Sequence, residues 1–377
     1  MKVLSKYFLT NLLGGKQEKV TLLKCHEFFR VMIFAQIAQR RSLSDVVLGL
    51  KSSGKSLYHI GIKRRVSKSN LSKANNRREW KIFYDFAQML KVVASELYKK
   101  DNLKELKLDA CVYALDSTTI DLCLSLFPWA TFRKTKSAVK AHTLLSLSGK
   151  IPNFVLISKG EMHDVNAMDY IEWEPGSWYV MDRAYVDFER LYLIHMSQAL
   201  FVTRSKKGIK YRRVYSADAD KSKGILCDQK VILSEEQTRK KYPELLRRIK
   251  FIDSETGKRL VFLTNNMKVD AEVISRLYKN RWHVELFFKW IKQHLHVQSF
   301  FGHSENAVKS QLWIAVCVYL LLSIIKKQLQ LSHSLYEILQ ILGLHIFEKN
   351  PILSLFDEDY YTSIDTLSGN QLELFRF

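Results

Sequence analysis

Cysteine is scarce in this sequence, and the cysteines that are present follow no pattern. They show neither a Cys-x2-Cys pairing nor a Cys/His spacing suited to zinc; the five are Cys25, Cys111, Cys123, Cys227 and Cys317. The usual zinc-binding spacings are therefore excluded. Because Cys111 and Cys317 lie in apolar runs, we expect reduced, buried thiols in a cytoplasmic protein.

Long apolar runs are lacking as well. The opening residues, MKVLSKYFLTNLLGGKQ, hold no apolar stretch typical of a signal peptide. An apolar run near the other end, Leu312 to Ile325, is shorter than the roughly 20 residues that a membrane span needs. We therefore expect a buried core helix there and no membrane partner. Repeats of fixed period and low-complexity segments are also missing.

Acidic residues are few relative to basic ones. The 377 residues include 59 Lys and Arg against 38 Asp and Glu, which gives a net charge of +21 and a pI near 9.6. With 47% hydrophobic residues the chain is globular, and its length favours more than one domain. The excess of positive charge indicates a polyanionic partner, most commonly nucleic acid; the alternative is an enzyme that is merely basic.

Apolar residues recur at helical spacing on either side of a basic segment within residues 1–105. The flanking helices are LKCHEFFRVMIFAQIAQ and REWKIFYDFAQMLKVVASELYKK. Between them, Ser67 or Ser69 can cap a short helix. We expect this segment to contact DNA phosphates, and the alternative is a solvated basic surface. Its basic residues are Lys63, Arg64, Arg65, Lys68, Lys73, Arg77 and Arg78.

From about residue 108, short apolar runs replace the helical spacing. CVYALDSTTIDL, AVKAHTLLSL, IPNFVLIS, SWYVMDRAY and ALFVTRS are typical of strands, and Ser148-Gly149 is typical of a hairpin turn. Helices between the later strands indicate a mixed α/β sheet that is partly buried on both faces. Residues 206–260 are rich in Lys and Arg and predict a β-rich insertion, with one helical turn capped by Ser234.

Two aspartates directly follow buried strands. Asp116 closes VYALD and Asp182 closes WYVMD, so each is placed at the rim of the sheet. If the two strands are neighbours, both carboxylates can bind one metal. The alternative for each is an ordinary turn or cap aspartate. Four rivals stay open, the first and last being poorer candidates from their positions before a strand and at a helix start: Asp109, Asp121, Asp164 and Asp187.

The stretch YKNRWHVELFFKWIKQHL, residues 278–295, predicts a helix with one narrow polar face. We expect this helix to begin near Asp270 and to be mainly buried, because apolar side chains take most of its surface. The alternative is a ladder of i,i+4 ion pairs worth a few tenths of a kcal/mol each. At about 100° per residue, its polar residues fall within a stripe about 60° wide; they are Tyr278, Arg281, Glu285 and Lys292.

A metal and a phosphodiester beside that face would explain why one carboxylate shares it with cations. Three clustered carboxylates would repel one another without a metal, so we expect such a site to bind cations. Two Mg²⁺ ions about 4 Å apart would activate the attacking oxygen and neutralise the leaving oxygen. The other polar residues of the stripe would then hold phosphate oxygens.

The motifs LDST, MDRAY and YKNRWHVELFFKWIK resemble those of bacterial insertion-sequence transposases of the insertion sequence four family. These are DDE enzymes marked by a Tyr-x2-Arg-x3-Glu-x6-Lys signature. This sequence matches every spacing with Tyr278, Arg281, Glu285 and Lys292. The resemblance, which covers roughly residues 108–325, implies an RNase H-like core with a metal-binding triad. The implied triad is Asp116, Asp182 and Glu285, with the other signature residues on the phosphates at the element end.

Together with the composition, the resemblance implies five segments. These are a helical DNA-binding region (1–105), the first part of the RNase H-like core (106–205), a basic β-rich insertion (206–260), the second part of the core with the catalytic helix (261–300), and a C-terminal helical region suited to dimerisation (301–377). The implied DNA transposase uses Mg²⁺, with Mn²⁺ as a substitute, to cleave element ends and transfer strands into target DNA.

The implied partners are double-stranded DNA, as terminal inverted repeats and target, and a second copy of the chain. Two other functions stay open. A stand-alone nuclease with the same core would cut DNA without joining it. A transposase relic without catalysis would bind DNA as a repressor. A chromatin-like structural protein would explain the net charge of +21 but not the one-sided polar stripe.

Overall fold

The structure is a computed structural model that describes residues 23–348 and 351–356, apart from a few positions between them; these are Arg64, Lys100, 102–107, Asp109, His296 and Gln298. The described chain splits into two compact units. The helical unit contains the residues up to Ala87, His294–Gly302 and the chain from Asn306 onward. The sheet unit contains Gln88–Gln293 and His303–Glu305.

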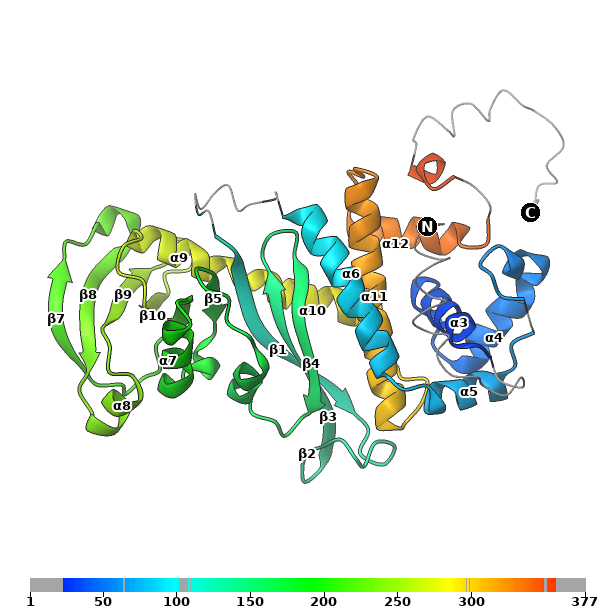
Figure 1. Ribbon diagram of the computed structural model, residues 1–377, viewed down its shortest axis with the longest axis horizontal. Helices are drawn as coiled ribbons and strands as arrows, with labels where there is room; N and C mark the ends of the chain where they lie inside the picture. Colours follow the sequence, from blue (N-terminus) through cyan, green and yellow to red (C-terminus); the bar gives the residue numbers. More distant parts are fainter. Residues whose placement is uncertain are drawn as a thin grey trace. The chain divides into compact units, whose positions relative to one another are not determined.

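The described part of the sheet unit is built on one 10-stranded sheet (Figure 1). The strand order is β2-β3-β1-β5-β6-β10-β9-β8-β7, and β4 pairs with β3. The β1–β5 and β5–β6 pairs are parallel, and the other pairs are antiparallel. The strands are β1 Val112–Leu122, β2 Thr131–Arg133, β3 Lys136–Ser146, β4 Ile151–Lys159, β5 Trp178–Met181, β6 Leu200–Arg204, β7 Tyr211–Ala217, β8 Ile225–Leu233, β9 Leu246–Ile252 and β10 Arg259–Thr264.

Apart from the short β2, which was not predicted, the strands between residues 112 and 204 follow the sequence patterns that predicted them. All four residues of β5 are buried, as expected for a strand that is covered on both faces. The turn between β3 and β4 lies at the predicted Ser148-Gly149. Gly149 has φ +68° and would, with a Cβ atom, collide with the ring of Tyr98, so this turn requires glycine. The mixed α/β sheet is therefore confirmed.

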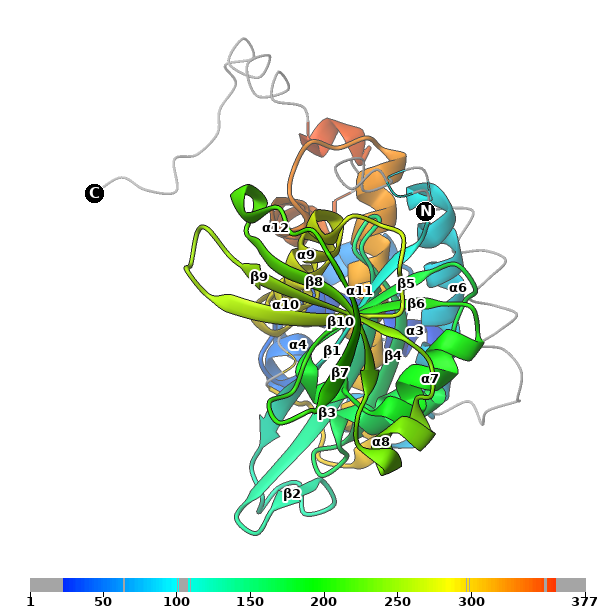
Figure 2. The same ribbon diagram turned by 90° about the vertical axis from the view of Figure 1, so that its left-hand side faces the viewer.

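Helices cover the two faces of this sheet (Figure 2). One pair, α7 and α8, lies on one face, and a second pair, α9 and α10, lies on the other. The core beneath α7 packs Leu191 and Ile194 of that helix against Leu115, Met181 and Phe201 from three strands. The helices are α7 Phe188–Met196, α8 Glu236–Lys241, α9 Ala271–Asn280 and α10 Trp282–His294, and the short 3-10 helices are η3 Asp164–Tyr170, η4 Arg183–Tyr185 and η5 Lys221–Lys223.

The basic segment 206–260 extends the central sheet. Its strands β7, β8 and β9 pair in order and join the core through β10. The strands expected there are present, but they continue the main sheet instead of forming a sheet of their own. The predicted helix cap is wrong. α8 begins after Glu235, whose side chain makes no cap hydrogen bond, and the backbone N–H of Ser234 donates to the carbonyl of Lys210 at the end of the strand pairing.

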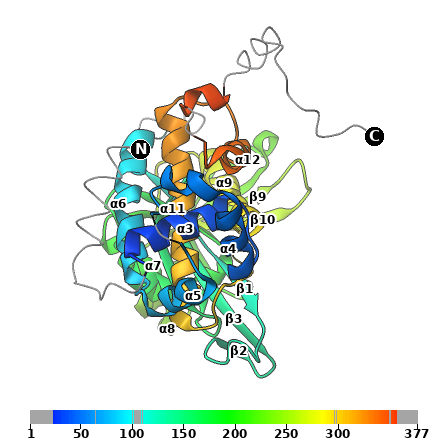
Figure 3. The same ribbon diagram turned by 90° about the vertical axis from the view of Figure 1, so that its right-hand side faces the viewer.

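Figure 3 shows the helices of the helical unit. Aromatic side chains pack between them. Phe29 stacks on Phe83 with ring centroids 5.8 Å apart and meets Phe86 edge-on at 5.1 Å. Ser67, one of the two expected caps, accepts a hydrogen bond from the backbone N–H of Asn70 and caps α5. The helices are α3 Cys25–Ile37, α4 Leu43–Ser52, η1 Gly54–Tyr58, α5 Lys68–Arg77, the first part of α6 Lys81–Tyr98, α11 Glu305–Gln328, α12 Leu335–His345 and η6 Leu353–Phe356.

Most of the predicted basic segment is exposed, with one exception. Arg78 is 7% exposed, and its guanidinium donates to the carbonyl oxygen of Leu23. This side chain anchors the helical unit, so its predicted part in phosphate contact is wrong. Arg64 lies outside the described residues. The exposed members are Lys63, Arg65, Lys68, Lys73 and Arg77.

α11 is longer than the apolar run that predicted it. It spans 24 residues, so the argument that the run is too short for a membrane span is wrong for the helix as a whole. Its length and composition alone would allow a span, which is weak evidence because 83% of its most apolar window is buried inside the structure. Trp313 packs edge-on against Tyr84 at 4.9 Å. The packing is that of the expected core helix.

The cysteine environments differ in part from the expectation. Cys25 and Cys317 are buried, whereas Cys111 and Cys123 are exposed and Cys227 is half-buried; all five are free thiols. The prediction of a buried Cys111 is wrong because burial along this apolar run begins one residue later, at the start of β1.

Candidate active site

Asp116 and Asp182 lie on adjoining parallel strands. β1 and β5 pair up to Leu115 and Met181, and each aspartate is the next residue in its chain. Asp182 directly follows β5, as predicted. β1 continues past Asp116, however, because it also pairs with β3. Asp116 therefore marks the end of the parallel pairing, and the prediction that its strand ends there is wrong.

Both carboxylates belong to the face of the sheet that α9 and α10 cover. The residues just before them, Leu115 and Met181, belong to the core beneath α7. Successive side chains of a strand alternate between the two faces, so the aspartates point the other way. Arg204 extends this row, since it follows Thr203, the partner of Met181 on β6. A cation thus stands beside Asp182 in the sheet.

The segment 278–295 forms two helices where one was expected. α9 ends at Asn280, α10 begins at Trp282, and Arg281 forms the turn between them. Arg281 keeps helical backbone angles of φ −52° and ψ −31°, so the polar stripe stays on one side across the turn. Asp270 stands at the N-cap of α9, as expected, although its side chain makes no cap hydrogen bond.

Tyr278 contacts the second aspartate. Its hydroxyl donates to the Asp182 carboxylate over 3.1 Å. Its ring packs on Phe262 of β10 with ring centroids 4.9 Å apart. Burial raises the pKa of Tyr278 to about 12, so the phenol stays protonated at neutral pH and remains a hydrogen-bond donor.

Arg281 joins the other two carboxylates. Its Nη1 lies 2.6 Å from Oδ2 of Asp116, and its Nη2 lies 2.6 Å from Oε1 of Glu285. The side chains of Arg281 and Asp116 are only 14% and 19% exposed. Burial lowers the pKa of Arg281, but the neighbouring carboxylates outweigh it and raise this pKa above its ordinary value. The guanidinium is therefore a permanent positive charge between two acids.

The three acids also act on one another. Burial raises the pKa of Asp116 to about 6, although Arg281 lowers it. The carboxylates of Glu285 and Asp182 add to the rise, which shows that all three acids interact electrostatically. A raised carboxyl pKa at a buried cluster of acids is typical of a functional site.

Lys292, at the far end of the polar stripe, contacts β1, the strand that carries Asp116. Its Nζ donates to the carbonyl oxygen of Thr119 on β1 over 2.7 Å. Burial lowers the pKa of Lys292, and the carboxylate of Asp121 opposes this shift. The neighbouring Lys289 on α10 is exposed. The structure thus brings the four signature residues and both aspartates to one face of the sheet.

A second polar cluster adjoins the acids. The sequence analysis named only one of its members, Asp164, and did not predict that these residues lie together. The Ser117 hydroxyl donates to Oδ1 of Asp164 over 2.8 Å, and Nζ of Lys140 donates to the same oxygen over 3.1 Å. His142 is fully buried, with its Nδ1 3.9 Å from that oxygen. Burial lowers the pKa of His142 to about 4. The polar alternation of Lys140 and His142 along β3 is the sequence signal that could have found it.

The rival aspartates have other roles in the described residues. Asp187 caps α7 by accepting from the backbone N–H of Arg190 over 3.1 Å, as expected. Asp164 belongs to the second polar cluster, and Asp121 acts on Lys292. Asp109 lies outside the described residues.

The donor set of Asp116, Asp182 and Glu285 fits a divalent metal. Carboxylate oxygens are the ligands that Mg²⁺ and Mn²⁺ prefer, and three interacting acids need a nearby cation. As the side chains stand, no three acidic, His or Cys groups among the described residues are arranged to hold an ion. The guanidinium of Arg281 contacts both Asp116 and Glu285 in that space. A metal held by Asp116 and Glu285 would therefore have to displace Arg281 from their oxygens.

Known proteins match the chain across this site. Residues 107–321 match the family described as Transposase DDE domain. A protein of Sinorhizobium fredii named transposase y4zB is 30% identical over 290 residues, which cover 76% of this chain and 79% of that protein. A transposase for insertion sequence element IS5377 of Geobacillus stearothermophilus is 30% identical over 241 residues, which cover 63% of each.

Two further matches give no information on function. Residues 14–63 match a family described as a domain of unknown function, DUF4372. A solved synaptic complex of piggyBac transposase with hairpin DNA is similar with a TM-score of 0.45 and 9% identity, covering 91% of this chain and 73% of that chain. A likeness that distant carries no argument.

Clustered, interacting acids on a mixed sheet are typical of enzymes that cleave or join phosphodiester bonds. The chain belongs to the DDE transposases, because the family match spans more than half of it and includes every acid of the site. Two of its relatives are named as transposases for insertion sequence elements, and the protein is an insertion-sequence DNA transposase. Enzymes of this family depend on divalent metal ions.

Proposed function

We propose that this transposase belongs to the insertion sequence four family and uses Asp116, Asp182 and Glu285 as its catalytic triad. The observation that carries the proposal is the double contact of Arg281 with Asp116 and Glu285, which joins residues that are 165 positions apart in the chain. The contact of Tyr278 with Asp182 supports it. Three of the four signature residues, Tyr278, Arg281 and Glu285, take part in these contacts, which supports the proposal.

The bound metal, Mg²⁺ or Mn²⁺ held by the three carboxylates, would activate the attacking oxygen and neutralise the leaving oxygen of a phosphodiester. The chain's own groups do the positioning. Tyr278 fixes one oxygen of Asp182 and so orients the other. Arg281 balances the acids until its guanidinium turns to a phosphate, which it fits with two parallel hydrogen bonds. Lys292 adds a second cation for the DNA backbone.

The reaction then has two steps at one site. Water first cleaves one strand at the element end, which leaves a 3′-hydroxyl and a 5′-phosphate. That hydroxyl next attacks a phosphodiester of the target DNA in line, forming the new bond as the target strand's 3′-oxygen leaves. Both steps displace an oxygen from phosphorus, so the same three acids and the same phosphate contacts serve both.

The strands that carry the acids support an RNase H-like core. β4, β3 and β1 are antiparallel neighbours, and β5 and β6 continue from β1 in parallel. We assign residues 106–205 and 261–300 to this core, interrupted by the basic segment 206–260. Residues 1–105 would bind double-stranded DNA at the terminal inverted repeats, for which the exposed cations around α5 are suited.

We assign dimerisation to residues 301–377, since a homodimer can bridge two element ends. Most of α11 is buried within the helical unit and so is not available to a partner. The interface would therefore fall on α12, where Leu344 is 78% exposed and Tyr336 is 44% exposed.

An assay of cutting and joining tests the proposal. The full-length protein is incubated with Mg²⁺, a duplex that carries the element's own terminal repeat, and a target plasmid. We expect cut ends that become joined to the plasmid, and no product when a chelator removes the metal. Ends that are cut but never joined would indicate a stand-alone nuclease. Binding without any cutting would indicate a repressor, and either outcome would overturn the proposed reaction.

A further inference from the structure

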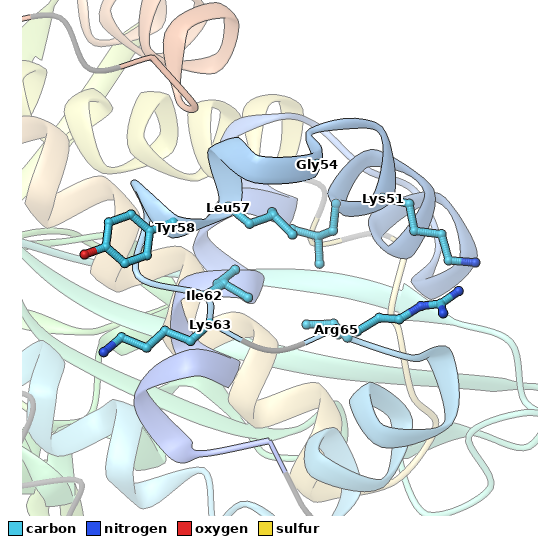
Figure 4. A pocket seen from close by; sticks show the side chains of 9 residues that line it. Lys51, Gly54, Leu57, Tyr58, Ile62, Lys63 and Arg65 are labelled. Carbon is cyan, nitrogen blue, oxygen red and sulfur yellow. The ribbon is translucent and has the colours of Figure 1, made fainter.

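A pocket of about 590 Å³ opens in the helical unit (Figure 4). It lies where the end of α4, the short helix η1 and the segment before α5 meet. Its floor is apolar, because Leu50, Ile62 and Val66 are only 2%, 3% and 4% exposed. Its rim is cationic and aromatic and carries Lys51, Tyr58, Lys63 and Arg65.

The cations stand at two ends of this pocket. Lys51 and Arg65 extend toward one end, and Tyr58 and Lys63 lie at the other, with apolar side chains between them (Figure 4). The ring of Tyr58 is 70% exposed. No acidic residue is among the described residues that line the pocket. The pocket therefore suits a ligand that has negative charge at two ends and a flat, apolar middle.

The pocket wall is held in place from behind. Arg30 of α3 donates to the carbonyl oxygen of Gly61 over 2.9 Å. Gly61 has φ +74°, and the Arg30 guanidinium lies where a Cβ atom would be, so the turn after Tyr58 requires glycine. The backbone of this turn is therefore fixed by a side chain of another helix and needs little ordering when a ligand binds.

We propose that this pocket binds one unpaired nucleotide of DNA. The base would lie on the apolar floor against Tyr58, and the phosphates on its two sides would contact Lys63 at one end and Lys51 with Arg65 at the other. A DNA strand carries a phosphate on each side of every base, which matches the two cationic ends. The inference rests on the proposed function and names the form of DNA that this unit holds.

Intact duplex DNA fits these features less well. Its bases are stacked on one another, so a duplex would reach the cations of the rim but leave the floor and the ring of Tyr58 without a partner. A base that has left the stack presents a flat face, and stacking of such a base on an aromatic side chain is worth about 1–3 kcal/mol. The match to a family of unknown function, residues 14–63, contains most of the pocket. This segment would then bind DNA.

Binding of the full-length, metal-free protein to two DNAs tests this inference. One is a short single strand with a fluorescent 2-aminopurine base at its centre, and the other is the duplex of the same sequence. We expect Tyr58→Ala to weaken binding of the single strand about tenfold and to change duplex binding by less than about twofold. The 2-aminopurine signal, which responds to stacking, should change with the wild type and stay unchanged with the variant.

Two control variants separate the ring from general damage. Tyr58→Phe keeps the ring and should bind both DNAs as the wild type does. Tyr170→Ala removes another exposed tyrosine, 61% exposed and in the sheet unit, and should do the same. Equal losses on both DNAs in Tyr58→Ala, or no loss on the single strand, would overturn the pocket's role while DNA binding stands. A wild type that binds neither DNA would overturn the proposed function as well.

Discussion

Arg281 lies 2.6 Å from Asp116, although 165 positions separate them in the chain. The contact joins the turn between α9 and α10 to β1, the strand that pairs in parallel with β5. The other arm of the same guanidinium reaches Glu285. One cation of the chain thus balances two acids that a metal would otherwise have to balance.

Arg281→Ala should make part of the protein's stability depend on a divalent cation. Without the guanidinium, Asp116 and Glu285 face each other unpaired, which should cost about 1–3 kcal/mol of unfolding free energy near pH 7. Mg²⁺ can replace the lost charge. Thermal unfolding should therefore show a larger rise of Tm with Mg²⁺ in the variant than in the wild type.

The surface pair of Arg276 and Glu272 on α9 supplies the matched control. Arg276→Ala removes a cation of the same helical segment, but its side chain is 54% exposed. It should leave the response to Mg²⁺ as in the wild type. An equal response of Tm to Mg²⁺ in both variants would contradict the account of Arg281.

Tyr278→Phe should slow DNA cleavage without loosening the fold. The substitution keeps the ring on Phe262 and removes the hydrogen bond to Asp182. A hydrogen bond to a charged group is worth about 1.5–3 kcal/mol, so single-turnover cleavage should fall roughly tenfold or more. The same hydrogen bond also stabilises the folded state, so the Tm should fall, but by no more than a few degrees. If the cleavage rate is unchanged, the phenol does not orient the carboxylate.

Lys292→Ala should weaken DNA binding and lower its dependence on salt. Each phosphate contact contributes about 0.9 to the slope of log affinity against log salt, so the slope should drop by about one. Lys289→Ala is the control, because Lys289 is an exposed lysine on the same helix. It should change the slope much less. Equal changes in both variants would mean that Lys292 contributes general charge only.

His142 should make the protein less stable in mild acid. Burial lowers its pKa from 6.5 to about 4, with Asp164 opposing this shift and Lys140 adding to it. The unfolded chain then takes up a proton at a higher pH than the folded chain does. The stability that neutral His142 contributes is therefore full above about pH 6.5 and is lost as the pH falls toward about 4.

The measurement is the free energy of unfolding at several pH values between about 7 and about 5. In His142→Gln, the loss of stability across this range should be smaller than in the wild type, by on the order of 1–3 kcal/mol. Parallel curves for the two proteins would show that His142 is not the group that titrates.

The polar stripe could be predicted from sequence because helical periodicity alone decides which side chains share a face. That argument placed Tyr278, Arg281, Glu285 and Lys292 together, and the turn at Arg281 did not disturb it because the backbone stays helical there. Asp182 was predictable for a similar reason, since its short strand is buried throughout and ends directly before it.

The remaining features depend on contacts between distant parts of the chain. The continuation of β1 past Asp116 follows from its pairing with β3, which no local pattern shows. The contact of Asp164 with Lys140 joins residues 24 positions apart, which local spacing does not predict. Arg78 looks like one more surface cation in the sequence, and it is buried because the carbonyl of Leu23 meets it. Tertiary structure, not local propensity, decides these positions.

The central claim is that the carboxylate of Glu285 completes the catalytic triad. The most direct test of this claim is DNA cleavage by the Glu285→Gln variant. The measurement is the rate of cleavage of a terminal-repeat duplex in Mg²⁺, together with the affinity of the same protein for that duplex. Glu272→Gln on α9 serves as the control and should cut as the wild type does. The account predicts that Glu285→Gln binds the duplex within about threefold of the wild type and cuts it at least about 100-fold more slowly. Cleavage at the wild-type rate would contradict it.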